Sequence, residues 1–322
     1  MPNMKTSFVL TVALCSASVA VWCRSGGQIS SLPTRPPIVG VSHIGLQVSD
    51  LAAAENFYGH VLGYAHFSLD KPAGGLFLYY YKINDHQYIE IYPTLTDLNQ
   101  DRMTHFSFET TNIQQLRDYL DSKGVKVPAT LKPGLDKNLS FSVKDPEGHR
   151  VEFVQYMPGG LHSSYFGKLL PDTRVSNRMI HVGVTIQDRE AADKFYKDIL
   201  GFQLKWYGGR NVNDDKEVDW VDMRVPDGTD WLEYMLNSHD PTPKQLGVMH
   251  HLALGVDKIQ PGYQAVMSRG YTPPAPPKIG RDGKWQLNLF DANETRAELM
   301  ELSLFKPRVA RQCCRSYRGL SP

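Results

Sequence analysis

The order histidine, glutamate, histidine, glutamate occurs twice along the chain, and this repeat constrains the fold more than any other feature. The first set is His43, Glu90, His105 and Glu152, and the second is His181, Glu233, His251 and Glu298. The two sets are separated by 138, 143, 146 and 146 residues. Each histidine opens an alternating apolar run typical of a strand, and each glutamate lies inside such a run. Two nitrogen and two oxygen ligands on strands predict a divalent metal site in each half of the chain.

Motifs around these residues divide the folded part into four similar modules. The first and third modules carry Phe-Tyr-x-x-x-Leu-Gly in a predicted helix, at residues 57–63 and 195–201. The second and fourth modules end with an Asp-led turn, at Asp145 and Asp291, that runs into the strand with the second glutamate. The sequence therefore predicts that each module consists of a strand, a helix and three further strands.

One such module is too small to cover its own sheet. We therefore predict an α+β fold in which four βαβββ modules pair into two open, cup-shaped mixed-sheet barrels. Alternate strand residues, the predicted ligands among them, line the inside of each cup. The sequence leaves open whether the first module pairs with the second and the third with the fourth, or the first with the fourth and the second with the third.

The predicted organisation follows composition and turn signals along the chain. It consists of a signal peptide at residues 1–20, a linker at 21–38, a first domain at 39–157, a second linker at 158–177, a second domain at 178–305 and a flexible tail at 306–322.

The N-terminal segment is typical of an export signal. Lys5 precedes an apolar run, and Ser18-Val19-Ala20 forms a small-x-small cleavage site, which predicts a periplasmic or secreted protein. The formal net charge is +1 and no basic stripe is present, so we expect no nucleic-acid partner and no membrane association after cleavage. We expect a small-molecule substrate and a monomer or homodimer. No cysteine lies between Arg24 and Gln312, which excludes a disulfide framework or thiolate metal site in the folded part.

These modules resemble the vicinal oxygen chelate superfamily, which includes glyoxalase I, extradiol dioxygenases and bleomycin-resistance proteins. The resemblance covers residues 39–305 and rests on the Phe-Tyr-x-x-x-Leu-Gly helix and on the Asp-Pro-x-Gly-x-x-x-Glu turn that starts at Asp145. The second copy of that turn departs from the pattern, with Ala292 in place of the proline and Glu294 in place of the glycine.

The resemblance implies that the eight residues bind one divalent metal ion per set, with Zn, Ni, Co, Mn and Fe(II) as the candidate metals. A His-Glu-His-Glu order is similar to glyoxalase I, a lyase or isomerase that moves a proton on a substrate with vicinal oxygens. It further implies that Glu152 and Glu298 act as catalytic proton shuttles beside the metal. Glutathione is chiefly a cytosolic thiol, so export favours another substrate, such as a hydroxy-ketone, a keto-sugar or a 2-keto acid.

Two other functions remain open. An extradiol dioxygenase would use Fe(II) held by His181, His251 and Glu298 alone. The tyrosine that such enzymes carry before the Asp-led turn is replaced here by Ser142 and Asn288. A non-catalytic binding or resistance protein would be expected to lack ligands, and none is missing.

The sequence also suggests where several side chains near the predicted ligands should lie. Because successive strand residues face opposite ways, His250 should point away from the site that contains His251. Arg150 and Arg296 should share a strand face with the second glutamate of each set, where they either anchor an anionic substrate group or remain solvated at the rim. Tyr79 and Tyr81 share one strand face that could line the first cup, although the ordinary packing of aromatic strand residues is favoured, and His149 is expected at the surface.

Overall fold

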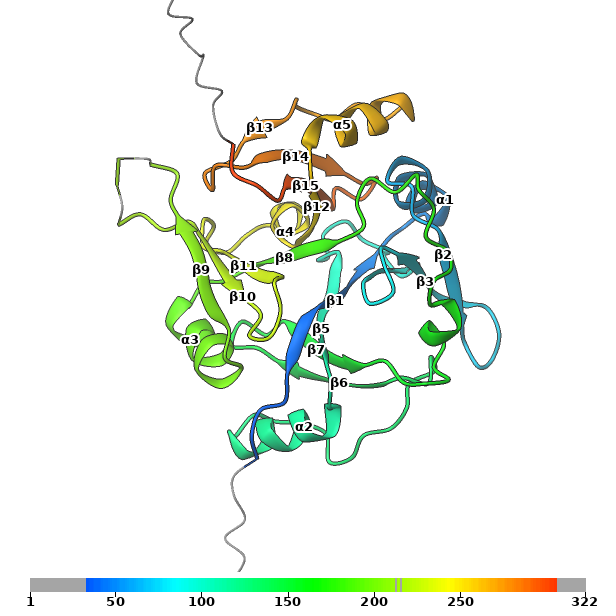
Figure 1. Cartoon of the computed structure of the whole chain (residues 1–322), viewed down its shortest axis with the longest axis vertical. Coiled ribbons are helices and arrows are strands. Elements are labelled where there is room, and N and C mark those ends of the chain that lie inside the picture. The colour runs from blue at the N-terminus through cyan, green and yellow to red at the C-terminus, as the bar shows by residue number, and fades with distance from the viewer. Residues whose placement is uncertain (1–32, 212, 215, 306–322) are drawn as a thin grey trace, which may run out of the picture. The chain divides into compact units, whose positions relative to one another are not determined.

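Two mixed β-sheets form the frame of the protein (Figure 1). The computed structural model describes residues 33–211, 213–214 and 216–305. The predicted signal peptide, most of the first predicted linker and the predicted tail lie outside the described residues.

The first sheet holds seven strands, all from the first two modules. They are β1 (Ile38–Gln47), β2 (His66–Asp70), β3 (Leu76–Lys82), β4 (Tyr88–Tyr92), β5 (Met103–Thr110), β6 (Leu139–Lys144) and β7 (Arg150–Gln155). The second sheet holds eight strands from the last two modules. They are β8 (Met179–Thr185), β9 (Gln203–Gly208), β10 (Trp220–Arg224), β11 (Trp231–Met235), β12 (His251–Val256), β13 (Lys278–Ile279), β14 (Trp285–Phe290) and β15 (Arg296–Glu301).

The strand order answers the question of module pairing. In the first sheet the order is β2-β3-β4-β1-β5-β7-β6, and in the second it is β13-β14-β15-β12-β8-β11-β10-β9. The first strands of two modules, β1 with β5 and β8 with β12, lie antiparallel at the centre of each sheet. The first module therefore pairs with the second, and the third pairs with the fourth.

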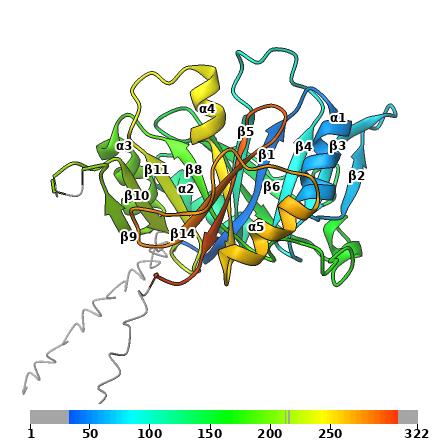
Figure 2. The same ribbon diagram turned by 90° about the horizontal axis from the view of Figure 1, so that it is seen from above.

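The helices lie between and beside these sheets (Figure 2). They are α1 (Leu51–Ala54), the π-helix η1 (Glu55–Val61), α2 (Ile113–Ser122), the 3-10 helix η2 (His162–Tyr165), α3 (Arg189–Asp193), the π-helix η3 (Lys194–Ile199), α4 (Pro243–Met249) and α5 (Ile259–Ser268). Asp50 caps α1 and Asp188 caps α3, because each side chain accepts hydrogen bonds from backbone N–H groups of the first helical turn. Helix α4, which begins with a capping box at Thr242, connects the third and fourth modules and was not predicted.

The Phe-Tyr motifs link the two sheets to each other. Both motifs lie in π-helical turns, which place Tyr58 and Tyr196 inside the protein. The hydroxyl of Tyr58 donates to Asp291 at 2.9 Å, and that of Tyr196 donates to Asp145 at 2.7 Å. The helix of the first module thus contacts the Asp-led turn of the fourth, and the helix of the third contacts that of the second.

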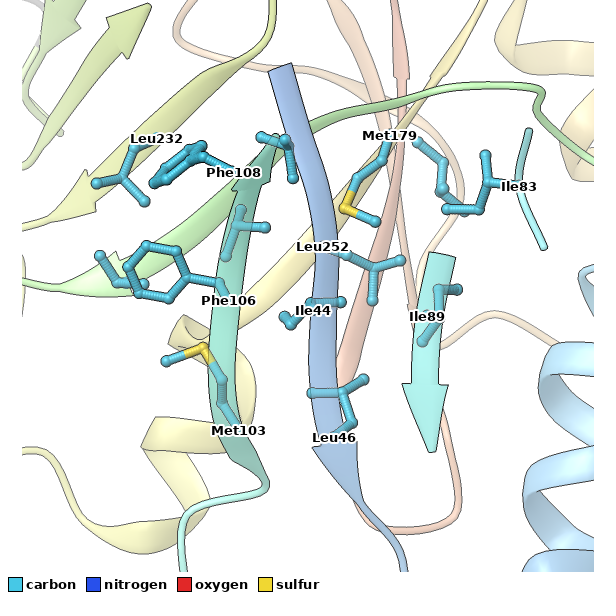
Figure 3. Close-up of a cluster of buried hydrophobic side chains, with 14 of the residues drawn as sticks. Ile44, Leu46, Ile83, Ile89, Met103, Phe106, Phe108, Met179, Leu232 and Leu252 are labelled. Atoms are coloured by element: carbon cyan, nitrogen blue, oxygen red, sulfur yellow. The ribbon is translucent and has the colours of Figure 1, made fainter. Parts of the chain in front are cut away.

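One hydrophobic core connects the two sheets. Ile44 and Phe106 of the first sheet and Met179, Leu232 and Leu252 of the second are fully buried in the same cluster (Figure 3). Each such side chain contributes about 1.5–3 kcal/mol through removal of apolar surface from water. Because strand side chains alternate, the opposite face of each sheet, which carries the histidines, points away from this shared core.

The segment predicted as the second linker is folded. After β7 the chain enters the 3-10 helix η2, where His162 is buried. Tyr156, Leu161, Tyr165 and Leu169 pack against Phe67 and its buried neighbours on the first sheet. None of the helices in the described part of the chain is both long and apolar enough to cross a membrane.

Candidate metal centres

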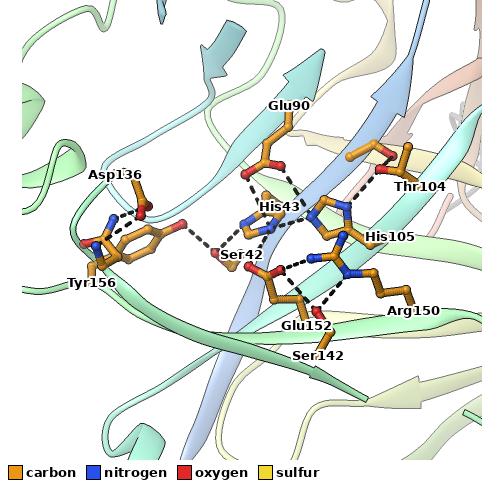
Figure 4. A network of polar contacts seen from close by, with 12 residues as sticks. Ser42, His43, Glu90, Thr104, His105, Asp136, Ser142, Arg150, Glu152 and Tyr156 are labelled. Carbon is orange, nitrogen blue, oxygen red and sulfur yellow. Dashed lines mark hydrogen bonds and ion pairs between the residues drawn. The ribbon is translucent and has the colours of Figure 1, made fainter. Parts of the chain in front are cut away.

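Four adjacent strands, β4, β1, β5 and β7, bring the first set of ligands together (Figure 4). The Nε2 atoms of His43 and His105 lie 3.1 Å apart. The carboxylate of Glu90 lies 3.5 Å from Nε2 of His43 and 3.4 Å from Nε2 of His105. An oxygen of Glu152 lies 3.6 Å from Nε2 of His43. All four side chains therefore converge on one point.

The second set repeats this arrangement on β11, β8, β12 and β15. The Nε2 atoms of His181 and His251 are again 3.1 Å apart. Glu233 lies 3.3 Å and Glu298 lies 3.6 Å from Nε2 of His251. We call the two clusters the first centre and the second centre.

A glycine in each first strand makes room for the second histidine. Gly45 lies opposite His105 in the sheet register, and Gly183 lies opposite His251. A Cβ atom at either glycine would collide with the imidazole ring across from it. The short sequence His-x-Gly, at residues 43–45 and 181–183, thus supplies both a ligand and the space for its partner.

The geometry and donor set fit a metal ion. Metal–nitrogen bonds of about 2.0–2.1 Å at right angles place two nitrogens about 3.0 Å apart. The observed separation is 3.1 Å in both centres. In each centre, ligand atoms of both histidines and the second glutamate lie within 4.8 Å of one another. The first glutamate, Glu90 or Glu233, approaches the same histidines from the other side.

Hydrogen bonds to the remaining ring nitrogens orient three of the four histidines. Nδ1 of His251 lies 2.7 Å from the carbonyl of Met249, which favours the proton on Nδ1 and leaves the lone pair on Nε2, the atom that faces the centre. Nδ1 of His105 lies 2.9 Å from the hydroxyl of Thr104, and Nδ1 of His43 lies 3.3 Å from that of Ser42.

Burial sets the protonation of the ligands. It lowers the pKa of His43 and of His251 to about 3 and that of His105 to about 4, so these imidazoles are neutral at pH 7. Burial also raises the pKa of Glu233 to about 7 and raises the pKa of Glu298. Burial makes the ionised form of both glutamates unfavourable unless a positive charge lies nearby. A divalent cation would supply that charge.

The two arginines lie on the predicted faces. Arg150 donates to Glu152 at 3.0 Å and to Ser142 at 2.8 Å, while half of its side chain stays exposed. Arg296 reaches further in, and its Nη2 lies 2.8 Å from Nε2 of His251. A cation at the second centre therefore requires Arg296 to turn outward, into the pocket that it lines.

Three expectations about neighbouring residues have different outcomes. His250 points away from the second centre, as predicted, and pairs with Asp101 at 2.7 Å. Tyr81 packs in the hydrophobic core and does not line the first cup: its hydroxyl donates to Glu55 of the helix, and Tyr80 instead lies opposite Glu90. His149 is not a freely exposed residue, since Nδ1 lies 2.9 Å from the buried carboxylate of Asp145.

The surroundings of the two centres differ, which the ligand pattern did not reveal. Phe67, Tyr80 and Tyr88 make the first cup aromatic. The second centre opens into a pocket of about 480 Å³, in which Asp222 lies opposite Glu233. The alternation of Trp220, Asp222 and Arg224 along one strand is the signal that could have identified Asp222.

Back-to-back sheets built from four repeated modules, with a His-Glu cluster in the outer face of each, define a vicinal oxygen chelate fold. The sequence profile of the Glyoxalase/Bleomycin resistance protein/Dioxygenase superfamily matches residues 40–153 and 178–299. The chain belongs to this superfamily.

Individual relatives include both glyoxalases and dioxygenases. Glyoxalase I of Saccharomyces cerevisiae is 28% identical over 100 residues, which span 31% of this chain and 28% of that protein. The 2,3-dioxygenase LapB from Pseudomonas sp. KL28 has a similar fold, with a TM-score of 0.65 at 15% identity over 85% of this chain and 95% of LapB. The Mn(II)-bound glyoxalase from Novosphingobium aromaticivorans gives a TM-score of 0.62 at 15% identity, with 83% of each chain covered.

Proposed function

We propose that the protein is a divalent-metal-dependent lyase or isomerase of the glyoxalase I type, which moves a proton on a small substrate with vicinal oxygens. The observation that carries this proposal is the additional carboxylate that the first glutamate, Glu90 or Glu233, provides in each centre. Glu90 and Glu233 lie within 3.3–3.5 Å of a histidine Nε2, so each centre offers four ligand side chains. A six-coordinate ion with four protein ligands keeps two positions for a chelating substrate.

The residues of the second centre suit this chemistry. A bound divalent ion would polarise the substrate carbonyl and stabilise the negative charge that develops on its oxygens. Glu298 is the proposed proton shuttle, because its carboxylate lies among the ligands and burial raises its pKa, which makes it a better proton acceptor. The imidazole of His251 uses its Nε2 lone pair as a ligand and is a poor base. In the first centre Glu152 holds the equivalent position.

An extradiol-type dioxygenase that uses Fe(II) is the alternative. Such an enzyme binds its iron through two histidines and one carboxylate. In the second centre His181, His251 and Glu298 lie close enough together to provide this set. Against it, Ser142 lies opposite Glu152 and Asn288 lies opposite Glu298. These are the positions at which the resemblance to extradiol dioxygenases implies a tyrosine. A binding or resistance protein is disfavoured because all eight predicted ligands converge.

Metal analysis combined with two activity screens tests these functions. The purified protein is loaded with Zn, Ni, Co, Mn or Fe(II), and each form is assayed with hydroxy-ketones, 2-keto acids and the hemithioacetal of methylglyoxal. Oxygen uptake is measured with catechols. Isomerisation without oxygen uptake supports the proposal, and metal-dependent ring cleavage with Fe(II) supports the dioxygenase. Metal binding without turnover in either screen supports a binding protein.

We also propose that the protein is exported, on the basis of the N-terminal signal at residues 1–20. Intact-mass measurement of protein from the native host tests this, since cleavage after Ala20 removes the first 20 residues. A full-length chain in the cytoplasm would contradict export, and glutathione adducts would then become the first substrates to assay.

A further inference from the structure

We infer that the two centres have different tasks: the first is a closed, structural metal centre, and the reaction takes place at the second. This assignment rests on the proposed function, because it assumes that both centres bind metal. It goes further in stating which centre meets the substrate.

The segment between the two halves covers one side of the first cup, over β2, β3 and β4. The hydroxyls of Tyr156 and Ser42 lie 2.5 Å apart, next to the ligand His43. The ring of Tyr165 stacks on Phe67 with centroids 4.1 Å apart. His162 lies between them, with its ring centroid 4.5 Å from that of Tyr80, the residue opposite Glu90.

A buried lysine on β3 forms hydrogen bonds to this segment. Lys82 has no exposed surface, and its ammonium group donates to the carbonyls of Tyr165 and Lys168 and to the carboxylate of Asp85. Asp85 also accepts the backbone N–H of Gly167 at 2.9 Å. An ammonium group is buried at low cost only when it is fully paired, so opening the segment would break several charge-assisted hydrogen bonds together.

The second cup has a different lining at equivalent positions. Asp222 lies opposite Glu233, where Tyr80 lies opposite Glu90 in the first sheet. Asp222 faces a pocket of about 480 Å³ that also contains Arg281 and Arg296. A charged pocket of this size admits a small polar molecule to the metal, whereas the packed rings of the first cup do not.

This contrast matches the general difference between structural and catalytic metal sites. A structural site is closed, and a catalytic site keeps a position for substrate. We expect metal to leave the first centre slowly, through local unfolding of the segment that contains Tyr165. Metal at the second centre exchanges through the pocket.

Metal release from the cobalt(II)-loaded full protein tests the assignment. A chromogenic chelator reports the total cobalt released. Tryptophan fluorescence reports the second centre, because Trp206 and Trp220 line its pocket and the ring of Trp231 lies 5.0 Å from that of His181. We expect two release phases that differ by about tenfold or more, with fluorescence recovery and loss of activity both following the fast phase.

Two neighbouring variants identify the slow phase. Tyr165→Ala removes the ring that stacks on Phe67 and should accelerate slow release at least about threefold without changing the fast phase. Phe166→Ala, at an exposed position next in the chain, should change neither rate. Release in one phase, fluorescence recovery in the slow phase, or an unchanged slow phase in Tyr165→Ala would overturn the assignment alone. A protein that binds no metal would overturn the proposed function as well.

Discussion

Replacement of one of two adjacent histidines provides a sharp test of the metal centres. His251 is a predicted ligand on β12, and His250 precedes it but faces Asp101 and Thr185. We expect His251→Ala to remove the metal of the second centre and His250→Ala to retain it. Both substitutions delete a buried imidazole, so a difference between them in metal content reflects the position of the ring and not its burial.

The size of the effect follows from linkage between metal binding and folding. A ligand at a hundredfold excess over its dissociation constant stabilises the folded state by about 2.7 kcal/mol per site. The described part of the chain extends from residue 33 to 305. At about 2.1 cal/mol/K per residue, its entropy of unfolding is about 0.6 kcal/mol/K. Each occupied centre should therefore raise the melting temperature by about 5 °C, and two centres by about 9 °C.

The assay compares melting temperatures with saturating metal and with chelator, together with metal content on the same preparations. The wild type and His250→Ala should show the full metal-dependent shift. His251→Ala should show about half of it and should lose one metal per chain. We expect a lower absolute melting temperature for His250→Ala, because Asp101 and Thr185 lose their hydrogen bonds to the imidazole, so only the shift is diagnostic. A full shift in His251→Ala would refute the ligand assignment.

Three further predictions concern catalysis, ligand space and pH. The Glu298→Gln variant should keep its metal but lose turnover by about a hundredfold or more. If the double variant Glu152→Gln, Glu298→Gln retains both the metal and the full rate, the isomerase mechanism is excluded. Gly183→Ala should weaken metal binding by about tenfold or more in a titration, because the added methyl group displaces the ring of His251; unchanged affinity would contradict the packing described for that strand. Burial lowers the pKa of His162 to about 3, whereas the pKa in the unfolded chain is 6.5. Burial of the neutral imidazole therefore stabilises the fold fully above pH 6.5, and this stabilisation is lost as the pH falls towards 3. Between pH 7 and pH 5 the wild type should therefore lose about 2 kcal/mol more stability in denaturant titrations than His162→Phe, and equal losses would refute the burial argument.

Much of the fold was predictable because its signals are local. Alternation identifies strands such as β1 and β12, and Asp50 and Asp188 identify the starts of helices through cap chemistry. The ligands were found because they recur at fixed places in repeated modules and lie on the same strand faces. Side chains alternate between the two faces of a strand with a period of two residues. The face that His43 occupies therefore follows from the local sequence and does not depend on the neighbouring strand.

Features that depend on contacts between distant segments could not be predicted in this way. The pairing of modules depends on which strands share the core between the sheets, and both candidate pairings contain the same local sequence. The bonds from Tyr58 to Asp291 and from Tyr196 to Asp145 join segments that are 233 and 51 residues apart. No local pattern specifies such partners.

The two cups illustrate the same limit. Residues 158–177 contain the glycines, prolines and serines of a linker, and composition gives no sign that His162 and Tyr165 cover one side of the first cup. They do so because Lys82 and the aromatic side chains of the first sheet provide paired polar groups and apolar surface at that place. Repetition in the sequence made the two centres look equivalent. The packing around them made one closed and the other open, since access to a site depends on everything that surrounds it in space.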